Sequence, residues 1–190
     1  IVTAFASIAD VRPTLTPQLV TSENGQALDT SLILIDLGEG KKRMGGSMLA
    51  QVIGQFGNDV PDLDNPAMLK ATVAAVNQLR AEGKLLAYHD RGDGGLWATV
   101  CEMAFAGHTG VALNVDMLVA ESTGVDDSRA DTGDAKNWAG QVGERRNELT
   151  LKALFNEELG VVLQVRTADR DAVLQTLREH GLSKHSHVIG

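Results

Sequence analysis

Residues 31–37, Ser-Leu-Ile-Leu-Ile-Asp-Leu, form a nearly unbroken apolar run. A strand with one face in water alternates apolar and polar residues, whereas a continuous apolar run is typical of a strand buried on both faces. Further strands are predicted by the aliphatic segments at 2–8, 85–88, 111–115, 160–166 and 187–189. Because helical patterns separate these segments, we expect an α/β or α+β fold with a mixed β-sheet flanked by helices.

The helix with the clearest pattern begins at Asp64-Asn65-Pro66 and ends at Gly83. Asp or Asn before Pro favours a helix start, and Gly often follows a helix end. The apolar stripe of this helix consists of Leu69, Val73, Val76 and Leu79. Other helices are expected after Ser47 as far as Gly57, and over 94–106, 148–155 and 168–180.

Composition limits the class of protein. The chain has 190 residues, of which 43% are hydrophobic and 22% charged, as in a soluble globular domain. Its net charge of −8 argues against a nucleic-acid surface. No apolar run approaches the roughly 20 residues of a membrane span, and a single cysteine, Cys101, excludes a disulfide framework. We therefore expect a cytoplasmic protein.

Both ends of the chain lie inside strand-like runs, and it begins with Ile1 rather than Met. We therefore expect residues 1–190 to be a single domain cut from a larger multidomain enzyme. Residues 120–147 are polar, with few aliphatic side chains. That composition predicts a flexible insertion.

Residues 87–96, AYHDRGDGGL, combine charged side chains with three glycines. Carboxylates between a strand and a glycine-rich helix start can hold Mg²⁺ and a phosphate together, because glycines permit close backbone approach and the first helical N–H groups lack partners. Asp90, at the strand end, is the better metal ligand, and Asp93 favours a helix cap. Two alternatives stay open: surface pairing of Asp90 with Arg91, and a purely structural role for His89 instead of an acid, base or phosphate donor.

Four other features have weaker patterns. Loop Lys41–Ser47 has cations and amide donors suited to an anion. Segment Phe155–Gly160 carries two carboxylates and an amide, and alone is typical of a helix end with solvated charges. His185 and His187 share a strand face but lack a third zinc ligand. Cys101 lies among apolar residues of a helix, where we expect it to pack.

Four segments together resemble a known enzyme family. They are TPQL, LILIDLGEGKKRMGGSMLAQV, LLAYHDRGDGGLWATVCEMAFAGHTGV and LKALFNEELGVVLQV. The HDR-x-DGGL and FNEELG segments, in this order, are similar to the long single-chain phosphoribosylformylglycinamidine synthases of bacterial purine biosynthesis. The resemblance is to the second of two domains similar to the C-terminal half of aminoimidazole ribonucleotide synthetase, and it covers the chain except for the expected insertion.

The resemblance implies an ATP-dependent ligase that converts formylglycinamide ribonucleotide, glutamine and ATP into the amidine, ADP, phosphate and glutamate. It implies ATP or ADP and Mg²⁺ as cofactors, with Asp90 as the metal ligand. Gly92, His89 and Arg91 are expected beside the nucleotide. The family has serine at the position of Gly92, so a contact here would use the backbone N–H. No catalytic residue is expected in this chain.

The remaining metal ligands and the glutaminase triad of the family belong to other domains. The expected partners are therefore the preceding synthetase domains and the glutaminase (glutamine amidotransferase) domain of the same chain, with neither nucleic acid nor a membrane. Alone, residues 1–190 are expected to lack ligase activity and to bind ADP poorly. Two alternatives are a scaffold domain whose nucleotide site has decayed, and another member of the aminoimidazole ribonucleotide synthetase superfamily.

Overall fold

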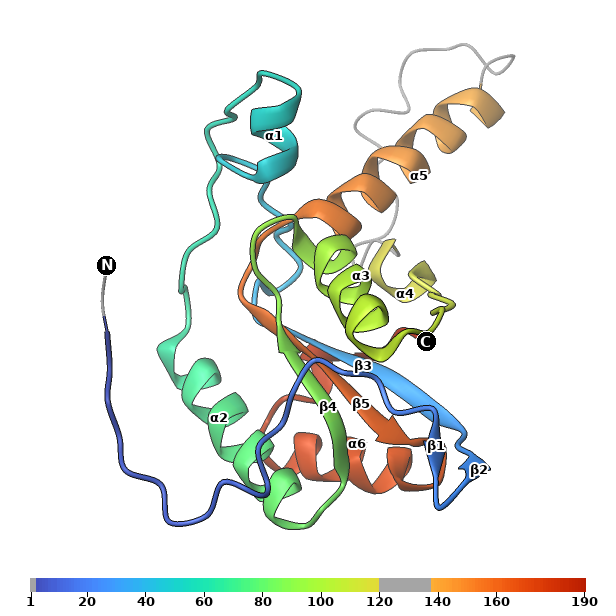
Figure 1. The fold of residues 1–190 in the computed structure, drawn as a ribbon. Coiled ribbons are helices and arrows are strands. Elements are labelled where there is room, and N and C mark those ends of the chain that lie inside the picture. The colour runs from blue at the N-terminus through green and yellow to red at the C-terminus, as the bar shows by residue number, and fades with distance from the viewer. Residues whose placement is uncertain (1–2, 120–137) are drawn as a thin grey trace.

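The computed structural model describes residues 3–119 and 138–190, and its centre is a four-stranded sheet in the order β4–β5–β3–β6 (Figure 1). The strands are β3 (Thr30–Asp36), β4 (Leu85–Asp90), β5 (Gly160–Arg166) and β6 (Ser186–Val188). Each pairing in this sheet is antiparallel. The expected sheet flanked by helices is confirmed, as an α+β fold whose sheet is antiparallel rather than mixed.

Helices cover both faces of the sheet (Figure 1). One face carries α2 (Pro66–Ala81) and α6 (Arg170–Glu179), and the other carries α3 (Gly95–Gly107), α4 (Asp116–Val119) and α5 (Trp138–Phe155). Successive side chains of a strand point to opposite faces. In β3, Ile33 and Ile35 therefore enter the core under α2 and α6, whereas Leu32 and Leu34 enter the core under α3 and α5. The prediction of a strand buried on both faces is confirmed.

The strand register brings three chain segments together at one end of the sheet. Asp36 pairs with Gly160, and Asp90 pairs with Val161. The end of β3, the end of β4 and the start of β5 therefore lie side by side. This end of the sheet is adjoined by the two glycine-rich segments, residues 38–47 and 90–95, and by the FNEELG segment, residues 155–160.

Helix α2 begins as the sequence predicts, with Asn65 at the cap and Pro66 in the first turn. The Asn65 side chain accepts a hydrogen bond from the Met68 N–H at 3.3 Å. The buried positions, however, are Met68, Thr72, Ala75 and Leu79. Of the predicted stripe, Leu79 is fully buried and Leu69 and Val76 pack partly against the core, whereas Val73 is 54% exposed and was predicted wrongly.

Other boundaries differ from expectation. Residues 3–8 and 111–115 form no strand, although the Asn114 N–H donates to the Ile189 carbonyl at 2.8 Å. The helix expected as far as Gly57 is reduced to the short α1 (Met48–Val52). The segment before β3 contains a small hairpin of β1 (Ser22–Glu23) and β2 (Gln26–Ala27).

Helix α5 is longer than predicted, because residues 138–147 of the expected insertion form its first turns. Residues 120–137 of that insertion lie outside the described residues. Two short 3₁₀ helices, Thr167–Asp169 and Ser183–His185, complete the C-terminal part. In the part of the chain that the structure describes, none of the helices has the length and apolar character to cross a membrane.

Candidate functional site

Asp90 ends β4 as an exposed residue. Its Oδ1 accepts a hydrogen bond from the Tyr88 hydroxyl at 2.5 Å. Both side chains point to the α2 face, because they are two positions apart on a strand. Burial, and then the hydrogen bond to Asp90, raises the pKa of Tyr88 well above its ordinary value. Tyr88 therefore stays protonated and fixes one carboxylate oxygen, while Asp90 Oδ2 has no partner among the described residues.

A pocket of about 330 Å³ opens beside Asp90 on this face. Its wall consists mainly of aliphatic side chains from α2 and from the segment that leads into β5. The polar residues of the lining are Thr72, Asn77, Tyr88, Asp90 and Arg91. The exposed carboxylate therefore lies at the border of an apolar hollow.

His89 points to the opposite face of the sheet. Its Nε2 lies 2.6 Å from Glu102 Oε2 of α3. The pair joins β4 to α3 near the surface, with Glu102 the more exposed partner. Two residues that are adjacent in the sequence thus face different sides of the sheet.

Arg91 is buried, and only 1% of its side chain is exposed. Its guanidinium donates to Asp36 Oδ1 at 2.6 Å and to the carbonyls of Glu158 and Leu159 at 2.5 and 2.9 Å. Arg91 therefore ties the end of β4 to β3 and to the start of β5. The alternative of a surface pair between Asp90 and Arg91 is therefore wrong, because the carboxylate partner of Arg91 is Asp36. The expected place of Arg91 beside a nucleotide stays a prediction.

The glycines after Arg91 make a tight turn into α3. Gly94 and Gly95 have φ values of 82° and 67°, in the region that favours glycine. A Cβ on Gly95 would lie 2.7 Å from the Leu154 carbonyl oxygen. In contrast, a Cβ on the exposed Gly92 would meet nothing within 4 Å. The turn therefore requires Gly94 and Gly95 but leaves open space at Gly92.

Glu157 binds at the start of α3. Its Oε1 accepts hydrogen bonds from the N–H groups of Gly94 and Met48, both at 2.8 Å. A carboxylate is favourable at a helix N-terminus because of the helix dipole. The prediction that Asp93 caps this helix is wrong, since the N-cap residue is Gly94, which has no side chain to accept a hydrogen bond from the first turn. An anion of the chain itself lies where the sequence suggested a phosphate.

Loop Lys41–Ser47 uses its cations within the chain. Arg43 Nε and Nη2 donate to the Glu158 carboxylate at 2.7 and 2.8 Å, and Nη2 also donates to Asp64 Oδ2 at 2.7 Å. Lys41 pairs with Asp64 at 3.0 Å, and Lys42 Nζ donates to the Leu118 carbonyl. The cations that the sequence offered to an external anion are therefore bound to acceptors of this chain.

The interpretation of 155–160 as a helix end with solvated charges is corrected as well. Glu158 is 1% exposed and pairs with Arg43. Asn156 Nδ2 donates to the Lys152 carbonyl at 2.6 Å and so closes the end of α5. Sequence reasoning missed the Arg43–Glu158 pair because the partners are 115 positions apart, and no local pattern connects them.

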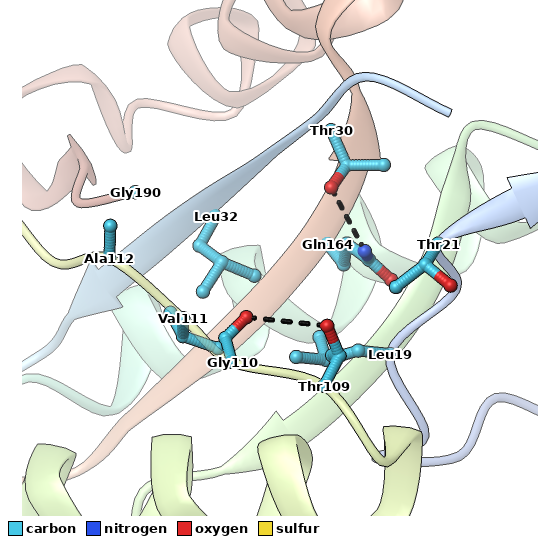
Figure 2. Close-up of a pocket in the computed structure, with 10 residues that line it drawn as sticks. All are labelled: Leu19, Thr21, Thr30, Leu32, Thr109, Gly110, Val111, Ala112, Gln164 and Gly190. Atoms are coloured by element: carbon cyan, nitrogen blue, oxygen red, sulfur yellow. Dashed lines mark hydrogen bonds between the residues drawn. The ribbon is translucent and has the colours of Figure 1, made fainter. Parts of the chain in front are cut away.

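A second pocket, of about 230 Å³, lies between β3 and the segment after α3 (Figure 2). Gln164 Nε2 donates to Thr30 Oγ1 at 3.1 Å at one end, and the Thr109 hydroxyl donates to the Gly110 carbonyl at 3.4 Å at the other. The residues that line it carry no charge. Among the described residues, this pocket therefore offers neutral hydroxyl, amide and backbone groups rather than charged side chains.

Nowhere in residues 3–119 and 138–190 do three His, Cys, Asp or Glu side chains come together as a metal site. Asp90 is thus a single carboxylate, and a Mg²⁺ ion there needs further oxygen ligands.

Burial lowers the pKa of His187 below its ordinary value, and the negative charge of Asp36 opposes that shift.

Comparison with known proteins identifies relatives of this fold. The family model of the AIR synthase related protein, C-terminal domain, matches residues 31–190. T. maritima PurL complexed with ATP is 12% identical over 94% of this chain, with a TM-score of 0.57. Phosphoribosylformylglycinamidine synthase II from Thermotoga maritima is 13% identical over 87%, with a TM-score of 0.51. E. coli HypE, a hydrogenase maturation protein, is 20% identical over 87%, with a TM-score of 0.52.

The chain spans only part of each of these proteins. It covers 23% of each of the two Thermotoga chains and 44% of the HypE chain. At identities this low, the comparison with these three structures shows a shared fold and no more.

Proposed function

Because the chain belongs to the family of the AIR synthase related protein, C-terminal domain, we propose that it is one domain of an ATP-dependent enzyme of this superfamily. The enzyme that we favour is phosphoribosylformylglycinamidine synthase, the glutamine-using ligase of purine biosynthesis. T. maritima PurL complexed with ATP and the Thermotoga synthase have a similar fold. The observation that carries the proposal is the exposed Asp90 carboxylate beside the open Gly92 position.

The residues at the end of β4 fit a Mg²⁺-bound nucleotide. Mg²⁺ is commonly bound through one or two carboxylates together with phosphate oxygens and water. Asp90 offers a carboxylate that is held at Oδ1 and open at Oδ2 among the described residues. In a ligase of this kind, the bound nucleotide supplies the phosphoryl group that activates an amide oxygen. Since one carboxylate holds Mg²⁺ weakly, the preceding synthetase domains provide the other ligands in this proposal.

Each residue near Asp90 has a defined part in this proposal. Asp90 holds the metal ion, and the Tyr88 hydroxyl orients its carboxylate. Gly92 donates its backbone N–H to the nucleotide. Arg91 positions the turn through its bonds to β3 and to the segment that leads into β5. His89 lies on the α3 face, paired with Glu102, and a contact with the nucleotide would require it to leave that pair.

The finer proposal names the rest of the enzyme. Formylglycinamide ribonucleotide is the substrate, and the glutaminase domain of the same polypeptide supplies ammonia in the cytoplasm. Residues 1–190 alone then bind ADP weakly and have no ligase activity, because the other half of the metal site is elsewhere.

A hydrogenase maturation protein is a second candidate. E. coli HypE has a TM-score of 0.52 and 20% identity, beside 0.57 and 12% for T. maritima PurL. The combination of HDR-x-DGGL and FNEELG favours the ligase. A scaffold with a decayed site is the third candidate, and the absence of a hydroxyl at Gly92 is what favours it.

The test is Asp90→Asn in the full-length polypeptide, with Asp93→Asn as the matched control in the same exposed turn. We expect Asp90→Asn to lose Mg²⁺-dependent nucleotide binding by about tenfold or more, as when a metal-ligating carboxylate is neutralised, while Asp93→Asn stays at the wild-type level. Nucleotide content and calorimetry measure the effect. Wild-type binding by Asp90→Asn would support the scaffold instead, and an assay of formylglycinamide ribonucleotide amidation separates the ligase from a maturation protein.

A further inference from the structure

The pocket beside Asp90 is lined by apolar side chains of α2 that are exposed or only partly buried. Leu69 and Val76 pack partly against the core and also line this pocket, and Val73 lines it with 54% of its surface exposed. Leu37, Leu159 and Val161 complete the apolar wall. A helix that turns three aliphatic residues toward an open hollow leaves apolar surface exposed to water, unless a ligand covers it.

The polar groups of the pocket select against an anionic occupant. Asp90 contributes a carboxylate at the border. The cation among the described lining residues is Arg91, and its guanidinium is engaged by Asp36 and two carbonyls. A phosphate or carboxylate inside the pocket would therefore meet a negative charge without an available compensating one.

A neutral, flat, heteroaromatic ring meets these requirements. Its faces can contact the aliphatic wall, and its ring nitrogens and exocyclic amine can use polar groups at the rim. Asn77, exposed on α2, provides a carboxamide that both donates and accepts. The volume of about 330 Å³ lies at the lower end of the range of small-molecule pockets.

We propose that this pocket binds the adenine base of the nucleotide, with Asp90 at the end where the metal-bound phosphates leave the pocket. This inference rests on the proposed function for the nucleotide and adds the position of its base. It makes α2 a determinant of base recognition, in addition to its role in the core.

Adenosine is the probe for the pocket, because it carries the base without the phosphates. Methyl NMR spectra of residues 1–190 are recorded with increasing adenosine. We expect chemical-shift changes at the methyl groups of Leu69, Val73 and Val76. Val73→Trp fills the pocket and abolishes these changes at Leu69 and Val76. Ala74→Trp adds the same bulk at the next, exposed position of α2, outside the pocket, and leaves them at the wild-type level.

In the full-length polypeptide, Val73→Trp is expected to weaken Mg²⁺-ADP binding about tenfold or more, since the buried area of the base is lost. Binding of Mg²⁺-pyrophosphate, which has no base, stays unchanged.

Asp90→Asn separates this inference from the proposed function. It removes the Mg²⁺-dependent binding but leaves the adenosine shifts intact. Absent adenosine shifts, or equal loss in Val73→Trp and Ala74→Trp, would overturn the base pocket, whatever happens at Asp90. Normal adenosine shifts with wild-type Mg²⁺-ADP binding by Asp90→Asn would overturn the metal site and keep the base pocket.

Discussion

Two glycine-rich segments adjoin the same end of the sheet, and they use their charges in opposite ways. In residues 38–47, Arg43 is 8% exposed and its guanidinium pairs with Glu158 and Asp64. In residues 90–95, Asp90 and Gly92 are exposed. Both segments combine charge with glycine in the sequence, yet the first binds its cations to acceptors of the chain, whereas the second leaves the Asp90 carboxylate exposed next to the buried Arg91.

The two segments differ because distant parts of the same chain supply different partners to their charged side chains. Glu158 comes from the segment before β5 and neutralises Arg43 inside the protein. Gly38 leaves room for this contact, because a Cβ at that position would lie 2.6 Å from Glu158 Cγ and collide with it. Among the described residues, the Asp90 carboxylate receives the neutral hydroxyl of Tyr88 and no counter-charge. A charge that already has a buried counter-charge stabilises the fold, and a charge without one remains available to a ligand.

The largest expected effect is on the buried pair. Glu158→Ala leaves the Arg43 guanidinium buried without its main counter-charge, and removal of one partner of a buried pair costs about 3–5 kcal/mol. The pKa of Arg43 is raised above its ordinary value, first by the hydrogen bond to Glu158. Urea unfolding followed by circular dichroism measures the loss.

Asp90→Asn is the control from the exposed segment, because Asn can still accept from Tyr88. Its free energy of unfolding is expected to stay within about 0.5 kcal/mol of wild type, as for most surface substitutions. Equal losses in Glu158→Ala and Asp90→Asn would show that the two segments do not differ as described.

Glu157 joins Gly94 of the second segment to Met48, which directly follows the first, so its removal tests whether the two segments depend on each other. Glu157→Ala deletes the acceptor shared by Gly94 and Met48, and we expect a loss of about 1–2 kcal/mol from the helix dipole and two hydrogen bonds. Hydrogen exchange should become faster at both amides. Glu157→Gln keeps an acceptor oxygen, and protection at both amides should largely return. Faster exchange at only one amide in Glu157→Ala would contradict a shared link.

Sequence patterns predicted what depends on near neighbours. The buried β3, the Asn65-Pro66 start of α2 and the strand before Asp90 were all confirmed. Each follows from alternation or from a local cap, which a few consecutive residues determine. The stripe of α2 was wrong at Val73 because a broad apolar surface can be buried in more than one rotation, and packing against the sheet decides which.

The partners of charged residues could not be predicted in this way. Arg43–Glu158 and Arg91–Asp36 join positions that are 115 and 55 residues apart. Local sequence therefore favoured a solvated Glu158 and a solvent-facing Arg91, and both are buried. The exposed Asp90 at a strand end was predicted, but its role as a metal ligand stays a prediction.

Gly92→Ser tests whether the exposed segment, residues 90–95, contacts the nucleotide. The open space at Gly92 accepts a side chain, so the family's hydroxyl can be restored. One added hydrogen bond contributes about 0.5–1.5 kcal/mol, and we expect Mg²⁺-ADP affinity to rise by roughly two- to tenfold in calorimetry. Gly110→Ser is the matched control, since nothing lies within 4 Å of its Cβ either. Equal affinities in the two variants would remove Gly92 from the site.

The smallest effect concerns the pH dependence of the internal cross-link. The hydrogen bond from Lys41, and then the one from Arg43, lowers the pKa of the Asp64 carboxyl group below its ordinary value of 3.8. A carboxyl group whose pKa is lower in the folded state stabilises the protein above its unfolded pKa, and this contribution disappears as the pH falls through the folded value. Asp64→Asn should therefore have a lower thermal midpoint than wild type near pH 6, and the difference should narrow as the pH falls below 3.8. Asp93→Asn, from the exposed turn, accounts for the loss of one negative charge from an acidic chain. A wild-type to Asp64→Asn difference that stays constant from pH 6 to acid unfolding would mean that the Asp64 ion pairs add nothing to the stability of the loop.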